Sequence, residues 1–264
     1  MIRSRYSILP AAVMLGATVL VAGCSSDSGT TTTSSSTAAT QSSAAEAPAN
    51  MDGADLAARM LAATQKAGTV KYTTTSTSGS VETTTESEAV YSGDKVSASV
   101  TISGASAMQM ISIDNASKVY IKSEPLQMPK WTLVEASSSN PVIKAIATQL
   151  DAMKGSLDPS TSIKLFDQAG DFTNAGKETV DGVETTKYTG KMPTSALASL
   201  MGDLASAVPS TGTDPIDVQV FLDKDDRPIK ITQKGTFAGQ AIDSTVNYSG
   251  YGSDIKVVAP AVGS

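Results

Sequence analysis

The feature that most constrains the fold is a long succession of short segments in which apolar and polar residues alternate. In Lys95–Ser103 the apolar residues occupy every second position, which is the period of a strand with one buried face. Turn residues separate the segments, with Ser92–Asp94 and Asp181-Gly182 as clear examples. The predicted strands are Lys71–Thr77, Val81–Tyr91, Lys95–Ser103, Met108–Asp114, Val119–Lys122, Trp131–Glu135, Lys177–Val180, Val183–Thr189, Asp217–Leu222, Pro228–Gly235, Gln240–Tyr248 and Ile255–Val258.

Three amphipathic helices are predicted, one before the first strand and two that interrupt the series of strands. Ala54–Lys66 has apolar residues at helical spacing and precedes Gly68, a plausible stop. Pro141–Lys154 carries one apolar stripe, with Asn140 as its candidate cap. Thr194–Ala207 repeats that pattern.

Strands and helices do not alternate, so a doubly wound α/β sheet is disfavoured. The pattern favours an α+β fold: a large curved antiparallel β-sheet, or half-barrel, with the amphipathic helices on its concave face, enclosing a hydrophobic cavity. The alternative is that the helix stripes are simply core. The candidate residues lining this cavity are Ile146, Leu150, Leu197, Leu200, Met201 and Leu204.

Composition excludes several kinds of chemistry. The chain of 264 residues has no histidine and a single cysteine, so it offers no histidine triad, imidazole metal site or intramolecular disulfide. Its formal charge of −6 argues against nucleic acid as a partner. No nucleophile with its base is recognisable. We therefore expect no enzyme activity, no catalytic residue, no metal and no cofactor.

The first 23 residues have the features of a lipoprotein signal peptide. Arg3 and Arg5 precede Ile8–Val21, an uncharged run of 14 residues, which is shorter than the roughly 20 residues of a spanning helix. The run ends in Val21-Ala22-Gly23-Cys24, which resembles a bacterial lipobox. The alternative is an ordinary signal peptide that happens to end near a free cysteine. The lipobox predicts lipidation of Cys24 and anchoring at the extracytoplasmic face of the cell membrane.

Residues 24–50 are predicted to be the lipidated cysteine and a disordered tether. Of residues 25–50, 14 of 26 are Ser or Thr, and large apolar residues are absent, so burial cannot offset the entropy of ordering. The threonine run is a candidate for O-glycosylation. Residues 51–264 form a single predicted domain.

Three passages resemble the actinobacterial LppX/LprA/LprF/LprG lipoprotein family. They are Lys118–Lys122 with Pro129–Trp131, Val218–Asp223 with Arg227-Pro228, and Val246–Gly252 with Ala259-Pro260. Gly250 stands where the family has an acidic residue. The resemblance covers about 51–264 and implies a LolA/LolB-like half-barrel around a hydrophobic cavity.

The resemblance also implies a function. Members of this family bind or carry lipids and acylated glycolipids in the cell envelope, so the chain is expected to bind and transfer such ligands, with an envelope transporter as a further candidate partner. Of the family's residues, Cys24 alone transfers directly, as the acylated residue. The alternative function is an envelope regulatory sensor or assembly lipoprotein that acts through a protein partner.

Overall fold

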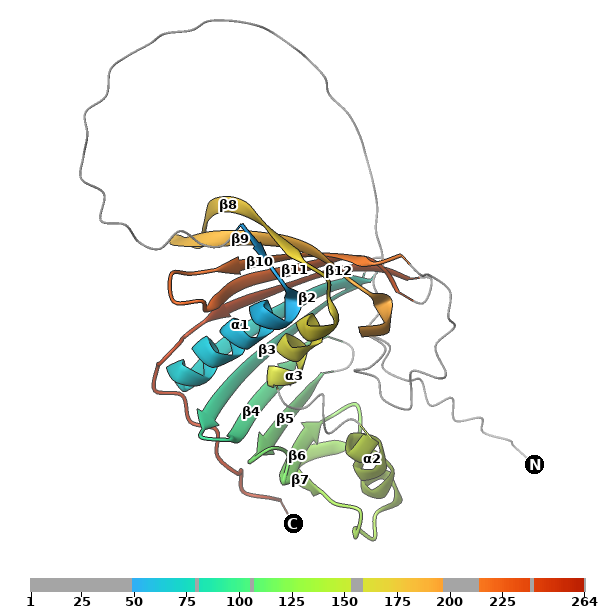
Figure 1. The fold of residues 1–264 in the computed structure, drawn as a ribbon. Helices are drawn as coiled ribbons and strands as arrows, with labels where there is room; N and C mark the ends of the chain where they lie inside the picture. The colour runs from blue at the N-terminus through green and yellow to red at the C-terminus, as the bar shows by residue number, and fades with distance from the viewer. Residues whose placement is uncertain are drawn as a thin grey trace, which may run out of the picture.

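A single antiparallel sheet of twelve strands dominates the computed structural model, which describes residues 49–78, 81–104, 107–152, 159–196, 214–237 and 240–263 (Figure 1). The strands lie in the order β1-β8-β9-β10-β11-β12-β2-β3-β4-β5-β6-β7. Within the described residues the edge strands β1 and β7 do not pair with each other, so the sheet is open. This is the large curved antiparallel sheet that the alternating segments predict.

The strands have the following bounds. They are β1 Asn50–Met51, β2 Thr69–Ser78, β3 Val81–Ser92, β4 Lys95–Ile102, β5 Met108–Ile113, β6 Lys118–Ser123, β7 Met128–Val134, β8 Phe172–Val180, β9 Val183–Met192, β10 Ile216–Leu222, β11 Pro228–Phe237 and β12 Gln240–Ser249.

The helical segments with complete bounds are α1 Gly53–Ala67, α2 Pro141–Ala152, α3 Pro159–Lys164 and the 3-10 helix η2 Leu165–Gln168. Helix α1 begins at Asp52, whose side chain accepts a hydrogen bond from the backbone N–H of Ala54 at 2.7 Å, and it ends at Gly68 with a φ of 77°. Helix α2 is capped as predicted, because Asn140 Oδ1 accepts from the backbone N–H of Val142 at 2.9 Å.

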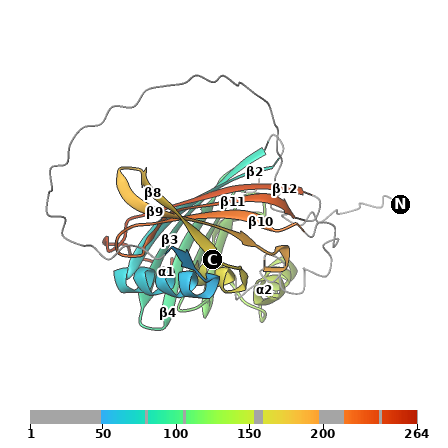
Figure 2. The same ribbon diagram turned by 45° about the horizontal axis from the view of Figure 1, so that its top comes forward.

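Helices α1 and α2 pack on the same face of the sheet. Directly opposite residues of neighbouring strands point to one face, and one row of such pairs runs from β10 to β5. Ile231 in this row packs in the apolar cluster that contains Leu56 of α1, which we call the α1 cluster. Met108 packs in the apolar cluster that contains Ile146 of α2, which we call the α2 cluster. The row consists of Val220, Ile231, Val246, Thr74, Thr85, Ile102 and Met108. Figure 2 shows both helices on this side, which we call the concave face.

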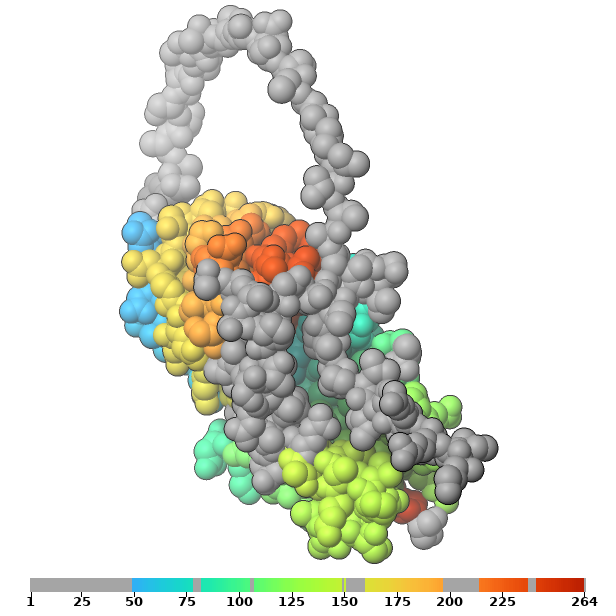
Figure 3. Space-filling view, turned by 90° about the vertical axis from the view of Figure 1, so that its right-hand side faces the viewer, coloured from blue at the N-terminus to red at the C-terminus, as the bar shows by residue number. Residues whose placement is uncertain are grey.

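The main core lies beneath α1, α3 and η2. Leu56 and Met60 of α1 are 0% exposed and pack with Phe166 of η2. Their partners on the sheet come from β8 to β12, and include Phe172 and Val218. A second, smaller cluster lies at the other end of the sheet, where α2 covers β5–β7. Figure 3 shows β8–β10 and the α2 end at opposite ends of the molecule.

Several elements differ from the sequence-based expectation. The predicted strand at Ile255–Val258 is wrong, because this segment forms no ladder. The C-terminal tail contacts β2 where Gly252 N–H donates to Thr69 O, and β7 where Gly263 N–H donates to Trp131 O. It therefore runs across the strands rather than beside one of them. Helix α3 with η2, and the first half of β8, were not predicted, because their apolar residues are too few to show a period.

Candidate functional site

The concave face between the two helix-covered clusters is lined by hydroxyl side chains on β2 and β3. The threonine and serine runs of these strands place every second hydroxyl on this face, because successive strand residues alternate between faces. Ser87 is buried and the others are half-buried. Ser76 Oγ donates to Ser244 Oγ at 3.2 Å. The hydroxyl residues are Thr74, Ser76, Thr83, Thr85 and Ser87.

An apolar surface continues the hydroxyl region toward α2. Val100 and Ile102 of β4 lie opposite Met110 and Met108 of β5, and all four are half-buried. The face is apolar because both strands alternate, with Ser99, Thr101 and Gln109 pointing to the other side. Methionine adapts its shape to irregular partners. This surface is therefore suited to a flexible apolar ligand.

Helix α2 flanks this apolar surface. Ile143, Ile146 and Leu150 pack against Val119, Ile121 and Met128 of the sheet. None of the three helix residues is fully buried, and Val142 on the outer side of α2 is 49% exposed. Helix α2 is therefore held by one narrow stripe.

A small pocket lies between α1, α3 and the sheet. Its volume is about 60 Å³, and its wall includes Tyr72, Tyr91 and Tyr248. The rings of Tyr72 and Tyr248 are 5.8 Å apart. Burial raises the pKa of the Tyr248 hydroxyl further above physiological pH, so this part of the wall is uncharged. Pockets for drug-sized ligands measure about 300–1,000 Å³, so this pocket alone would hold only the tip of a larger ligand.

The predicted site residues divide between described and undescribed parts of the chain. Ile146 and Leu150 face the sheet within the α2 cluster, as expected for the concave face. Leu197, Leu200, Met201 and Leu204 lie outside the described residues, as does Cys24. The helix expected from Thr194 does begin there, since Thr194–Ala196 are helical, and Ala196 is 0% exposed in the main core.

Sequence reasoning missed the four sheet residues Val100, Ile102, Met108 and Met110 as site candidates. Their signal was present, because Val100 and Ile102 belong to the clearest alternating strand and a Met-Gln-Met pattern begins at Met108. Periodicity identifies a face that turns away from water. It does not distinguish a face covered by the protein from one left partly open.

The described residues contain no recognisable metal centre. No group of three Asp, Glu, His or Cys side chains within them could hold a metal ion. A search of the same residues found no helix that is both long and apolar enough to cross a membrane.

Comparison with known proteins does not assign the chain to a family. No model of a known protein family matches the chain. An uncharacterised 31.2 kDa protein of Streptomyces griseus, from the rplA-rplJ intergenic region, is 28% identical over 122 residues. That match takes in 42% of this chain and 40% of the relative, so the chain spans well under half of that relative's length.

Three solved structures are similar. LprF from Mycobacterium bovis has a TM-score of 0.49 at 10% identity, over 79% of this chain and 97% of that protein. Lipoprotein LppX of Mycobacterium tuberculosis has a TM-score of 0.48 at 14% identity, over 77% and 98%. MucB, solved in complex with MucA, has a TM-score of 0.43 at 14% identity, over 80% and 60%. TM-scores below 0.5 support no inference about function, so membership of the LppX/LprF group stays a prediction.

Proposed function

We propose that the protein is a membrane-anchored lipoprotein of the cell envelope that binds and transfers lipids or acylated glycolipids on the concave face of its sheet. The observation that carries this proposal is the half-buried apolar surface of Val100, Ile102, Met108 and Met110 beside α2. A contiguous apolar surface that stays partly accessible beside a core is a common place for an apolar partner to bind. A flexible acyl chain is a suitable partner, because methionines adapt to it.

The uncharged character of the concave rows supports the same proposal. The row through Val100 continues to Ser87 and Tyr72 on one side and to Ile121 on the other, and none of these side chains carries a formal charge. Apolar chains can lie along such a row without leaving an ion desolvated. The neighbouring hydroxyls can donate to ester or sugar oxygens.

The anchor is proposed from the sequence. Acylation of Cys24 would hold the domain at the extracytoplasmic face of the cell membrane, at the end of a tether of 26 residues. A flexible tether of that length has a mean span of roughly 25–30 Å. Such a placement would bring the concave face within reach of membrane lipids.

To test the proposal, the full chain is purified from the membranes of an actinobacterial host. Its bound lipids are then extracted and identified. Organic solvent removes non-covalent lipid and leaves the thioether-linked chains on Cys24, so the extract reports only the bound ligand. We expect mass spectrometry to find a lipid enriched in the extract. An extract that matches the bulk membrane would contradict the proposal.

Two neighbouring residues on opposite faces provide a matched pair of variants. Met110→Glu places a charge on the apolar surface and should abolish lipid enrichment, while Gln109→Glu places the same charge on the other face and should leave it unchanged. Gln109 is exposed, whereas Met110 is half-buried and packs against the α2 cluster, so circular dichroism first checks that both variants fold. Equal lipid recovery from the two variants would show that the concave face is not the site. Recovery of one stoichiometric protein instead of lipid would favour the sensor function.

A further inference from the structure

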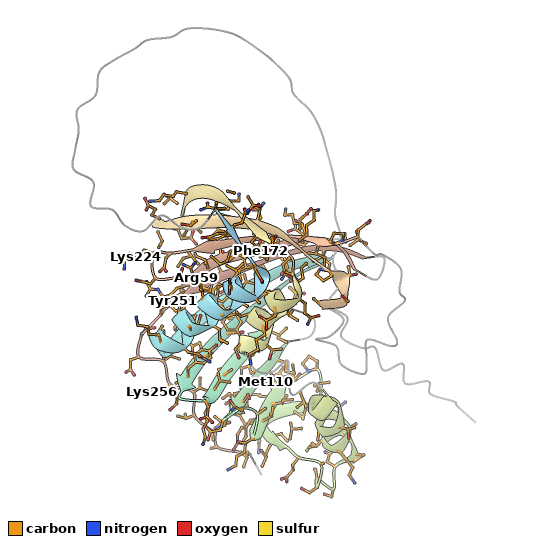
Figure 4. All side chains as sticks on the ribbon, in the orientation of Figure 1. Arg59, Met110, Phe172, Lys224, Tyr251 and Lys256 are labelled. Carbon is orange, nitrogen blue, oxygen red and sulfur yellow. The ribbon has the colours of Figure 1, made fainter. Side chains whose placement is uncertain are left out.

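A second pocket lies at one end of the sheet, where three chain turns meet. Its volume is about 460 Å³, which is within the range of ligand sites. The β8–β9 turn contributes Asp181 and the β10–β11 turn contributes Arg227. The end of β12 contributes Asn247 and Ser249, and β2 contributes Thr73. Figure 4 shows Lys224 of the β10–β11 turn and Tyr251 after β12 at this same end.

The polar floor of this pocket is on the convex face, away from the apolar surface beside α2. Thr73 lies directly opposite Asn247 in the β2–β12 ladder, and the next pair, Thr74 and Val246, belongs to the concave row. Since consecutive residues of a strand point to opposite faces, Thr73 and Asn247 point to the convex side. Ile229 and Val183 add an apolar part to the wall.

The arginine of this pocket is held in a fixed position. Arg227 Nε donates to Asp223 Oδ2 at 2.8 Å and its Nη2 lies 2.7 Å from the same oxygen. The Asp223 side chain is only 4% exposed. Its Oδ1 accepts from the backbone N–H groups of Asp225 and Arg227, each at 2.9 Å. The guanidinium also lies 5.3 Å from the centre of the Tyr251 ring, so it is preorganised on two sides.

Four polar side chains in the pocket have no partner among the described residues. Thr73, Asp181, Asn247 and Ser249 line the pocket, and their side chains make no hydrogen bond or ion pair with another residue in the described parts of the chain. Together they offer hydroxyl and amide donors, and hydroxyl, amide and carboxylate acceptors. Such convergent polar groups over an apolar patch are typical of a binding site.

We propose that this pocket binds a neutral saccharide of one or two sugar units. Sugar hydroxyls both donate and accept, as the four polar side chains do, and the C–H face of a sugar ring suits Ile229 and Val183. An anion is disfavoured, because the guanidinium is already paired with Asp223 and the carboxylate of Asp181 adds negative charge. This inference is independent of the lipid function, since the two sites lie on opposite faces.

The saccharide could come from a free glycan or from the headgroup of a glycolipid, and the experiment distinguishes them. The probes are methyl and butyl glycosides of glucose, galactose, mannose and arabinose, with inorganic phosphate as the anionic control. The full chain is held in phospholipid nanodiscs, empty nanodiscs serve as the blank, and ligand-observed NMR measures binding. We expect at least one methyl glycoside to bind and phosphate not to bind.

Matched substitutions on one strand test whether this pocket is the site. Thr73→Val removes a lining hydroxyl and should weaken binding about fivefold, the usual effect of one hydrogen bond. Thr75→Val makes the same change two residues along the same face of β2, where Thr75 lies opposite Thr245 outside the pocket. This control should bind like the unaltered chain.

The outcomes are decisive in both directions. Methyl and butyl glycosides that bind alike, with binding weakened by Thr73→Val, support recognition of a free glycan. Tighter butyl glycoside binding that Thr73→Val still weakens supports a glycolipid headgroup. The proposal is overturned by absence of methyl glycoside binding, by binding of phosphate instead, or by equal loss in Thr73→Val and Thr75→Val.

Discussion

Tyr251 joins separate parts of the fold at one end of the sheet. Its hydroxyl donates to the backbone oxygen of Pro228 at 2.6 Å. Its side chain packs against two small apolar clusters, one that contains Val70 of β2 and one that contains Phe221 of β10. Burial raises the pKa of the Tyr251 hydroxyl well above its usual value near 10. The folded chain therefore keeps this proton under alkaline conditions in which the unfolded chain loses it.

The retained proton makes stability depend on pH in a defined window. Below about pH 10 both states hold the proton, and the contribution of Tyr251 is complete. As pH rises above 10, only the unfolded state ionises, so the free energy of unfolding should fall by up to about 1.4 kcal/mol per pH unit for this group. Urea unfolding from pH 9 to 11 should show a shallower decline in Tyr251→Phe. Identical declines in the two chains would contradict this assignment.

Leu56 provides a test of the main core. The side chain is 0% exposed in the cluster beneath α1, so Leu56→Ala removes buried area and leaves a void. We expect the free energy of unfolding to fall by about 2–5 kcal/mol. Val142→Ala, at a site that is 49% exposed, should change it by less than about 0.5 kcal/mol. Chemical denaturation measures both, and similar losses would indicate that Leu56 is not in a packed core.

At the scale of elements, α2 should open independently of α1. The two helices belong to separate apolar clusters at different ends of the sheet, and α2 is held only by its half-buried stripe. Ile146→Ala should therefore destabilise α2 by about 1–2 kcal/mol, which is a factor of about 5–30 in its opening equilibrium. Hydrogen exchange should accelerate in α2 by that factor and stay unchanged in α1. Equal acceleration in both helices would show a single cooperative unit.

The elements that sequence predicted well are those with a long, unbroken period. The alternating strand at β4 and the helices α1 and α2 were all expected within a few residues of their observed bounds. Helix α3 covers only Pro159–Lys164, which is too short for a 3.6-residue period to repeat twice. The C-terminal tail alternates like a strand, but Ile255 is buried without a ladder. Local pattern cannot reveal that the tail crosses the sheet.

The candidate site was less predictable for a related physical reason. The sequence indicated Ile146 and Leu150 of α2 because an amphipathic helix has one obvious buried stripe. The sheet residues opposite them depend on register, which pairs Ile102 with Met108 and Val100 with Met110. The convex pocket depends on three turns that are far apart in the chain. Such sites arise from topology, which composition and periodicity do not encode directly.

At the scale of the whole molecule, the proposed function depends on the attachment at Cys24, the single cysteine of the chain. Lipobox processing requires its thiol, so Cys24→Ser should remain unprocessed or be released from the membrane. The unaltered chain should incorporate an alkyne fatty acid supplied to the cells, and Cys24→Ser should incorporate none. Gly23→Ala keeps a small residue before the cysteine and should still be labelled. Label retained by Cys24→Ser would refute acylation at this residue and, with it, the proposed anchored arrangement that would bring the concave face close to membrane lipids.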